Sequence, residues 1–345
     1  MKKVQKNIVL FFIFILATAF IGIKNKTNLF QYPKYWPKPI YDFKKNPITE
    51  EGFQLGRHLF YDTILSRDNT ISCASCHLQA TGFTHVDHDL SHGIDNRMGT
   101  RNSLALMNLA WKKSFMWDGS INHLEVQALA PIESVDEMDE SFANVIKKIN
   151  NSKKYKKLYY DAFKDSIATG QNTLLALTQF ELMLNSFNSK YDKYIRKENG
   201  VTFTEKEKNG LNVFRKNCAS CHTEPLFTND LFKNNGLPVD KTLNDEGRMT
   251  VTKKASDYLK FKVPTLRNIK KTRPYMHDGR FESLYEVVDH YMTGIESSKT
   301  LSQELKTPIK LSHKQKVELV AFLKTLTDYE FLRNPKFQFP KADTN

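Results

Sequence analysis

The sequence contains little cysteine, and the 4 cysteines among its 345 residues all fall inside two short pentapeptides. Because no cysteine lies elsewhere, a longer-range disulfide outside these pentapeptides is excluded. The chain also has a single long apolar run and few segments in which apolar and polar residues alternate. A second membrane-spanning segment is therefore not expected, and the sequence favours a mainly α protein with long loops rich in Asn, Asp, Gly and Lys.

The two pentapeptides, Cys73–His77 and Cys218–His222, have the same sequence, Cys-Ala-Ser-Cys-His. Two thiols three positions apart can add to the two vinyl groups of one haem, while the adjacent imidazole reaches the iron. A zinc site and a pair of disulfides are the alternatives, but zinc does not require a histidine directly after the second cysteine in both copies. We predict two covalently bound haem c groups. Their attachment and proximal residues are Cys73, Cys76 and His77 for the first, and Cys218, Cys221 and His222 for the second.

The N-terminal 25 residues resemble an export signal. Three lysines precede an apolar run of sixteen residues, 8–23, in which Ala17-Thr18-Ala19 offers a cleavage site. The run is slightly short for a membrane span, so an uncleaved anchor is the alternative to a signal peptide. Covalent haem attachment takes place outside the bacterial inner membrane, which predicts a periplasmic protein.

Charge and composition limit the possible functions less than the haem motifs do. The formal net charge is +13, with 26% charged and 40% hydrophobic residues, which is ordinary for a globular protein. Three of the positive charges lie in the N-terminal segment, and haem propionates would offset several more. The lysines are dispersed, as in Lys147-Lys148 and Lys153-Lys154, a pattern typical of solvated surfaces. We expect no nucleic-acid partner.

The two haem motifs divide the mature chain into halves with a shared plan, which predicts two cytochrome c-type haem domains at 26–168 and 169–345. In the second half, Thr204–Glu207 forms a capping box that starts a helix running towards Cys218. In the first half, Thr49 precedes a similar amphipathic segment. Two further helical stripes are predicted to pack in the core. They are Leu174, Leu177, Phe180, Leu184 and Phe187, and Val317, Leu319, Val320, Leu323 and Leu326.

The ligand on the other side of each iron decides between an electron carrier and a catalyst, because peroxide or oxygen needs a displaceable position. Spacing does not choose among the nearby side chains. The candidates are His85, His88 and His92 for the first haem, and His277, His290, Tyr291 and Met292 for the second.

Several blocks in order along nearly the whole mature chain resemble the bacterial di-haem cytochrome c peroxidases and their MauG-type relatives. The blocks are Leu55–Phe60, Ser91–Gly93, Gly99–Ser103, Trp117–Gly119, Glu137-Met138, Val263–Asn268 and Thr272–Gly279. The resemblance implies a peroxidatic first haem with His92 as a distal ligand that leaves on reductive activation. It also implies that Glu137 moves a proton between the two peroxide oxygens. Without the resemblance, Glu137 would be read as one charge of an acidic surface stretch.

The resemblance also assigns the second haem, at His222, to electron relay from an external donor. Trp117 then corresponds to the aromatic residue between the two haems, although a tryptophan alone is more typical of a core. Asn102, Thr272 and Pro274 correspond to a calcium site built from oxygen ligands. Taken without the family, these three residues would be assigned to loops.

One position departs from the peroxidase pattern. The family usually has methionine fourteen residues after the histidine of the His-Asp-Gly motif, whereas this chain has Tyr291 there and Met292 next. MauG-type members use tyrosine, and an anionic phenolate stabilises ferric iron relative to methionine. Adjacent helical residues lie about 100° apart, so only one of the two can face the iron. The register favours Tyr291.

The sequence as a whole predicts an exported di-haem enzyme that reduces hydrogen peroxide with electrons from a periplasmic donor, either a small cytochrome c or a cupredoxin. Family members are often homodimers. Two other functions fit the motifs: a MauG-like oxidase that acts on a protein, favoured by Tyr291, and a non-catalytic di-haem electron carrier. His92 and Glu137 favour the peroxidase.

Overall fold

The structure is a computed structural model that describes residues 29–340. The described residues from Tyr32 onward form one compact unit. The predicted signal or anchor, 1–25, lies outside the described residues. Within residues 29–340, none of the helices has the length and apolar character needed to cross a membrane.

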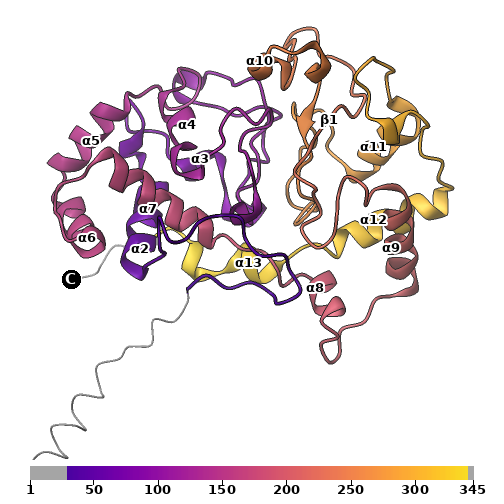
Figure 1. The fold of residues 1–345 in the computed structure, drawn as a ribbon, viewed down its shortest axis with the longest axis horizontal. Coiled ribbons are helices and arrows are strands. Elements are labelled where there is room, and N and C mark those ends of the chain that lie inside the picture. The colour runs from indigo at the N-terminus through magenta and orange to yellow at the C-terminus, as the bar shows by residue number, and fades with distance from the viewer. Residues whose placement is uncertain (1–28, 341–345) are drawn as a thin grey trace, which may run out of the picture. The chain divides into compact units, whose positions relative to one another are not determined.

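The mainly helical fold that the sequence predicts is confirmed (Figure 1). One small antiparallel sheet pairs β1 with β2 among long loops, with Phe232 opposite Lys262. The first half contains α2 Glu50–Tyr61, α3 Cys73–Cys76, α4 Leu129–Glu133, α5 Phe142–Asn151, α6 Lys153–Phe163 and α7 Gly170–Met183. The second half contains α8 Lys190–Ile195, α9 Glu205–Asn217, β1 Phe232–Lys233, α10 Met249–Thr252, β2 Phe261–Lys262, α11 Leu284–Asp289, α12 His313–Lys324 and α13 Tyr329–Arg333.

Helix α2 precedes the first haem motif and packs against α7. The Thr49 side chain caps α2 by accepting a hydrogen bond from the Gly52 backbone N–H. The two helices touch at Gly56, where a Cβ atom would lie 1.9 Å from the Ala176 carbonyl oxygen. A larger residue there would force the helices apart. Because α7 ends at Met183, Leu184 and Phe187 lie beyond the helix that their stripe predicts.

The second half contains the same kind of close helix contact, between α9 and α12. The predicted capping box is confirmed, since Thr204 and Glu207 exchange side-chain and backbone hydrogen bonds at the start of α9. At Gly210 a Cβ atom would lie 1.9 Å from the Glu318 carbonyl oxygen, as at Gly56. Helix α12 ends at Lys324, so Leu326 is buried beyond the helix and not on it. Each haem motif thus follows a helix held in close contact with a later one.

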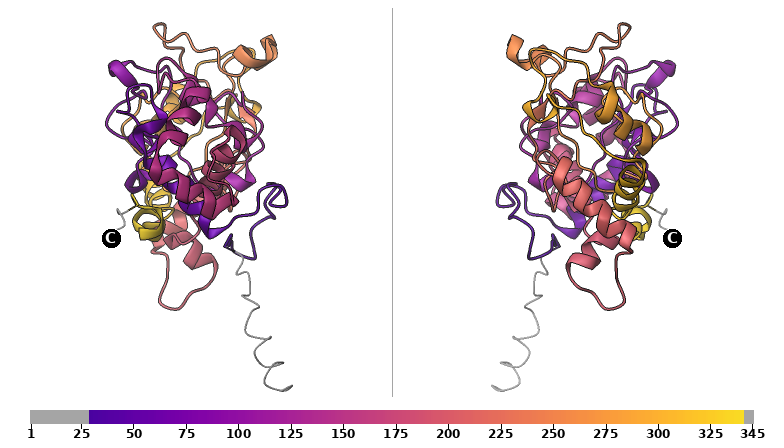
Figure 2. Two further views of the ribbon diagram at one scale, coloured as in Figure 1. Left: turned by 90° about the vertical axis from the view of Figure 1, so that its left-hand side faces the viewer. Right: turned by 90° about the vertical axis from the view of Figure 1, so that its right-hand side faces the viewer.

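The chain crosses between the halves more than once. Helix α7 begins just after the predicted boundary at residue 168, yet it packs on α2 of the first half. Helix α13 lies beside the first half as well (Figure 2), where the Gln79 side-chain amide donates to the Phe331 and Asn334 carbonyl oxygens. Helices α7 and α13 thus belong by sequence to the predicted second domain but lie beside the first half. The domain boundary at residue 168 stays a prediction.

A fully buried ion pair fixes the loop that follows β2. The Arg267 guanidinium donates two hydrogen bonds of 2.9 Å to the Asp192 carboxylate, and both side chains have 0% exposure. Arg267 also donates to the Pro225 carbonyl oxygen. Burial alone would raise the pKa of Asp192, but the guanidinium outweighs it and holds the pKa below its ordinary value.

Replacing Arg267 by methionine is expected to lower the free energy of unfolding by about 3–5 kcal/mol, because it leaves a buried carboxylate without its partner. The matched control is Arg273→Met, which breaks a pair with Glu282 in which both side chains are 56% exposed. That change should cost at most about 1 kcal/mol. Denaturant unfolding of both variants measures the difference, and equal midpoints would contradict the structural role of Arg267.

Candidate active site

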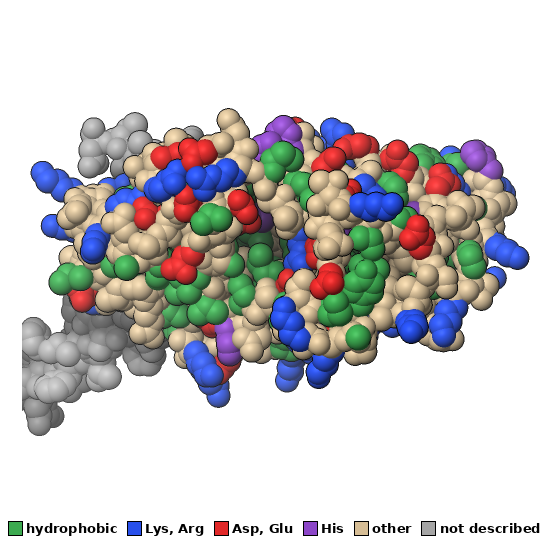
Figure 3. All heavy atoms as spheres, turned by 90° about the horizontal axis from the view of Figure 1, so that it is seen from above, with side chains coloured by type: hydrophobic (Ala, Val, Ile, Leu, Met, Phe, Trp, Pro, Cys, Tyr) green, Lys and Arg blue, Asp and Glu red, His purple; other side chains and the backbone are tan. Residues whose placement is uncertain are grey.

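The first haem motif and the residues expected to catalyse line one cavity in the first half. Its walls include Cys73, Cys76, His77, His92, Trp117 and Glu137. These residues come from α3 and from three loops that are far apart in sequence. The fold therefore brings together the side chains that the resemblance implied, and Figure 3 shows that the face seen from above is hollowed between the two halves.

The proximal histidine of this cavity is held in one tautomer. His77 Nδ1 lies 2.8 Å from the Phe83 carbonyl oxygen, so Nδ1 carries the proton and Nε2 is left free to bind a metal. Burial lowers the pKa of His77 to about 4, which keeps the imidazole neutral as an iron ligand must be. In the part of the chain that the structure describes, no disulfide joins the four cysteines, which leaves each sulfur available for a thioether. These residues fit a covalently attached haem.

His222 has the same arrangement in the second half. Its Nδ1 lies 3.2 Å from the Phe227 carbonyl oxygen and 3.1 Å from that of Pro264. Burial again lowers the pKa to about 4. A second cavity contains His222 together with Cys218 and Cys221. This site also fits a haem, with a neutral imidazole fixed by backbone carbonyls.

Of the three histidines proposed as distal ligands for the first haem, only His92 lines the cavity. His88 stacks on the His92 ring with centroids 4.1 Å apart, and His85 lies 5.3 Å from His88. The His92 carbonyl oxygen lies 3.4 Å from Cys76 Sγ, so the backbone of the His92 loop lies beside the haem motif. His92 is thus tied to the haem motif through its backbone, while its ring belongs to a row of three imidazoles.

Glu137 is joined to the His92 loop by backbone contacts. The Ile94 N–H donates to the Glu137 carbonyl oxygen at 2.8 Å. At Gly93, a Cβ atom would lie 2.2 Å from the Asp136 carbonyl oxygen, so only glycine allows the two segments to meet. Burial, and to a smaller extent Asp136, raises the pKa of Glu137. The carboxyl group therefore takes up a proton more readily than a solvated one.

The second cavity separates Tyr291 from Met292 as candidate ligands of the second haem iron. Tyr291 lines this cavity with His222, whereas Met292 packs against the apolar core around α9 and α12. Both lie in a π-helical turn, His290–Gly294, a form often found at functional sites. Burial raises the pKa of Tyr291 to about 12, so the phenol ionises only beside a strong positive charge.

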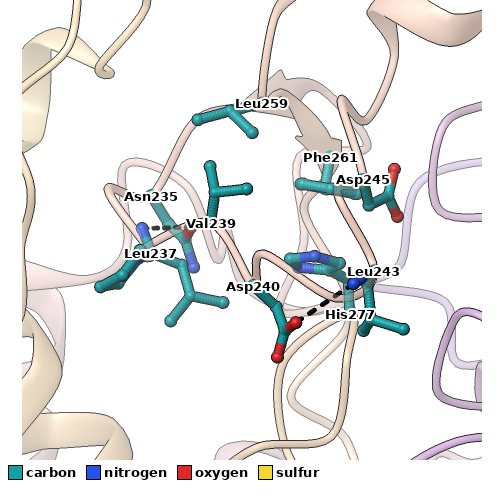
Figure 4. A pocket seen from close by; sticks show the side chains of 10 residues that line it. Asn235, Leu237, Val239, Asp240, Leu243, Asp245, Leu259, Phe261 and His277 are labelled. Carbon is teal, nitrogen blue, oxygen red and sulfur yellow. Dashed lines mark hydrogen bonds between the residues drawn. The ribbon is translucent and has the colours of Figure 1, made fainter.

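The other two candidates for the second iron differ from each other. His290 points elsewhere, with its Nε2 3.0 Å from the Asn235 carbonyl oxygen. His277 lines the second cavity and stacks on Phe261 with centroids 3.7 Å apart. Figure 4 shows His277 in a small pocket that Asp240, Leu243 and Phe261 also line. Tyr291 and His277 are therefore the two candidates in the cavity wall.

The two cavities share part of a wall. Trp117 lines both, and its indole Nε1 donates to the Asn102 carbonyl oxygen at 2.8 Å. Lys262, in β2, lines both as well and is 4% exposed. For Lys262 the expectation that lysines lie on solvated surfaces is wrong. No pattern in the sequence marks this lysine, because its burial depends on contacts between the halves.

Arg101 is a second residue to which the sequence assigned no role. It donates to Asp118 at 2.6 Å and to Asp245 at 2.6 Å, which links the first half to the second. These two carboxylates outweigh burial and raise the pKa of Arg101 further. Its place in the Gly99–Ser103 block was the only signal that could have pointed to it. The ion pairs hold the Trp117 segment against the second half.

The three residues of the expected calcium site line one smaller cavity beside Trp117. They are Asn102, Thr272 and Pro274. The Asn102 side-chain N–H donates to the Asp89 carbonyl oxygen at 2.9 Å, which directs its amide oxygen elsewhere. Amide, hydroxyl and carbonyl oxygens suit a hard cation, so these residues fit calcium. Calcium binding by these residues stays a prediction.

Two haem-attachment motifs in separate cavities, with a tryptophan in the shared wall, define a di-haem c-type oxidoreductase. Residues 50–200 match the family described as di-haem cytochrome c peroxidase. Together with the relatives below, this match places the chain in that family, which includes MauG.

Among these relatives, the methylamine utilization protein MauG of Methylorubrum extorquens is 35% identical, over 86% of this chain and 83% of its own length. Cytochrome-c peroxidase IdrP1 of a Pseudomonas species, strain SCT, is 32% identical over 90% of each chain. A solved MauG-like protein associated with microbial copper homeostasis superposes with a TM-score of 0.82 at 32% identity, covering 90% of this chain and 98% of its own. Relatives with either name are thus about equally similar.

Proposed function

We propose that this protein is a di-haem peroxidase that reduces hydrogen peroxide to water. Electrons come from a periplasmic donor, either a small cytochrome c or a cupredoxin. One observation carries the proposal: His92 and Glu137 line the same cavity as Cys73 and His77. An electron carrier needs neither a carboxyl group beside the distal ligand nor a loop that can release that ligand.

Haem, when bound at His77, supplies the redox-active iron for the two-electron reduction of peroxide. Glu137 takes the proton from the inner oxygen of peroxide and delivers it to the outer oxygen, so that the outer oxygen leaves as water. Two electrons and two protons balance the conversion of one peroxide into two waters. The raised pKa of Glu137 suits this transfer, because the carboxylate must accept a proton before it releases one.

His92 controls access to the cavity in this proposal. It lies on a loop outside any α-helix, and such a segment can reorganise at lower cost than a helix. The second cavity, at His222, receives the external electrons. Trp117 lies in the wall between the cavities and provides an aromatic side chain along the route.

The test is steady-state oxidation of a reduced cytochrome c or cupredoxin by the purified protein in the presence of peroxide. The proposal predicts two donor molecules oxidised per peroxide consumed. A protein that exchanges electrons with the donor but consumes no peroxide would instead be a carrier.

A second candidate function is favoured by Tyr291. A MauG-like oxidase would use peroxide or oxygen to oxidise a protein substrate, and a phenolate ligand at the second haem helps that haem to reach higher oxidation states. Tyr291 lines the second cavity and Met292 does not. Relatives named MauG are as similar to this chain as those named peroxidase.

The ligand is tested by two substitutions of adjacent residues. Tyr291→Phe is expected to change the absorption and electron paramagnetic resonance (EPR) spectra of the second haem, because it removes the phenol oxygen from the cavity. Met292→Leu should leave both spectra unchanged, since Met292 packs in the apolar core. The reverse pattern would make Met292 the ligand and weaken the MauG-like alternative.

The proposal also covers the location, the calcium site and the oligomeric state of the enzyme. Export through residues 1–25, as a cleaved signal or a membrane anchor, would place it in the periplasm, where haem is attached and small donor proteins are present. Calcium at Asn102, Thr272 and Pro274 would brace the segment next to Trp117. A homodimer is the form that the family resemblance implies.

A further inference from the structure

The cavity of the first haem motif is lined by two lysines that lack an acidic partner. Lys262 lines both haem cavities, and Lys112 lines the first cavity and the smaller one beside it. The Lys262 ammonium donates to the Ser114 carbonyl oxygen and lies 5.6 Å from the Phe115 ring centre. Within residues 29–340, neither lysine forms an ion pair with a carboxylate.

Asp230 attracts both lysines and Asp118 attracts Lys262, but each of these carboxylates has another partner. Asp118 pairs with Arg101 at 2.6 Å, and Asp230 accepts a hydrogen bond from the Lys113 backbone N–H at 2.7 Å. Burial, together with repulsion from the positive charge of Lys112, lowers the pKa of Lys262 to about 7. Burial also lowers the pKa of Lys112. Two ammonium groups in this position are costly unless an anion lies between or beside them.

The chemistry of haem attachment indicates which anion that is. The vinyl groups that bind cysteine lie on one edge of the porphyrin, and the two propionate carboxylates lie on the opposite edge. Cys73 and Cys76 line the first cavity and not the second. A haem attached there directs its propionates away from these cysteines. Of the cationic side chains that line this cavity, Arg101 already has two carboxylate partners, and Lys112 and Lys262 are left to meet the propionates.

We propose that Lys112 and Lys262 form the binding site for the propionate carboxylates of the first haem. The site is built by both halves, because Lys112 belongs to the first and Lys262 to β2 of the second. The Lys262 backbone N–H donates to the Trp117 carbonyl oxygen at 2.7 Å, so the same strand holds the lysine and the tryptophan in place. The proposal rests on haem occupying the first cavity, and it holds for a peroxidase or an oxidase alike.

A positive charge beside the haem carboxylates favours the reduced iron, because reduction adds an electron to the site. Lys262→Met and Lys112→Gln are therefore expected to lower the midpoint potential of the first haem. Lys262→Arg keeps the charge and should stay near the native potential. The matched control is Lys113→Met, which removes an exposed charge next to Lys112 and should shift the potential far less.

Spectroelectrochemical titration of the di-haem protein, with the two haems resolved by EPR, measures these potentials. Redox-difference infrared spectra add a second readout: a protonated carboxyl band is expected in Lys262→Met and absent in Lys262→Arg. If Lys262→Met does not retain both haems, Lys112→Gln and Lys262→Arg carry the test. Native potentials in fully loaded Lys112→Gln and Lys262→Met, or a larger shift at the second haem than at the first, would overturn the assignment. Peroxide turnover is not needed for any of these measurements.

Discussion

Replacing Glu137 by glutamine is expected to lower the rate of peroxide reduction by about 10²- to 10⁴-fold, the usual contribution of a positioned acid–base group. Glutamine has nearly the same shape but cannot accept the proton from the inner peroxide oxygen. Because Glu137 lines the cavity and is bound to the His92 loop through its backbone, the substitution should leave the fold and both haem spectra unchanged. Donor oxidation under saturating peroxide measures the effect.

Asp136→Asn is the matched control for this prediction, because Asp136 is the exposed neighbour of Glu137 and also raises its pKa. Turnover in Asp136→Asn should stay within a few-fold of native. Activity requires the ionised Glu137 carboxylate, so turnover is lost as the pH falls through its raised pKa. Removing Asp136 should move that loss to lower pH. Full turnover in Glu137→Gln would exclude Glu137 as the proton-transfer group.

Replacing His92 by glycine is expected to produce a five-coordinate, high-spin signal at the first haem of the fully oxidised protein. Of the three nearby histidines, only His92 lines this cavity. Its loss therefore leaves the distal side without a protein ligand. We propose that reductive activation removes His92 in the native protein, and turnover of the variant should begin without that step. Absorption and EPR spectra of the oxidised variant give the coordination state.

The stacked neighbour His88 supplies the control for this experiment. Its ring lies 4.1 Å from that of His92, but it does not line the cavity. His88→Gly alone should keep the native six-coordinate spectrum, and the double variant should match His92→Gly. A six-coordinate spectrum in His92→Gly that is lost only in the double variant would mean that His88 is the ligand.

Local patterns predicted the elements whose causes are local. The Thr204–Glu207 capping box gave the start of α9, and Thr49 that of α2. The ends were less predictable: Phe187 and Leu326 continue the apolar spacing but lie past the last helical turn. Apolar spacing records burial, and a buried residue in a loop satisfies the same pattern. Tertiary contacts, not spacing, decide where these helices stop.

The site residues could also be predicted only where their cause is local. The cysteine and histidine spacing sufficed for both haem motifs, since the covalent chemistry is local. Spacing alone could not separate His92 from His85 or His88, because only the folded loop shows which ring reaches the cavity. Lys262 was read as one of many solvated lysines, and its burial arises from the meeting of β2 with the Trp117 segment. A residue that is buried only by contacts between the two halves does not follow the apolar periodicity of either half.

The central claim is that the first haem cavity reduces peroxide and that His92 must leave it first. Steady-state peroxide consumption by the purified di-haem protein, measured before and after reduction by one electron, tests it most directly. The account predicts slow consumption by the fully oxidised protein and rapid consumption once the second haem is reduced. No consumption in either state would contradict it and leave a di-haem electron carrier.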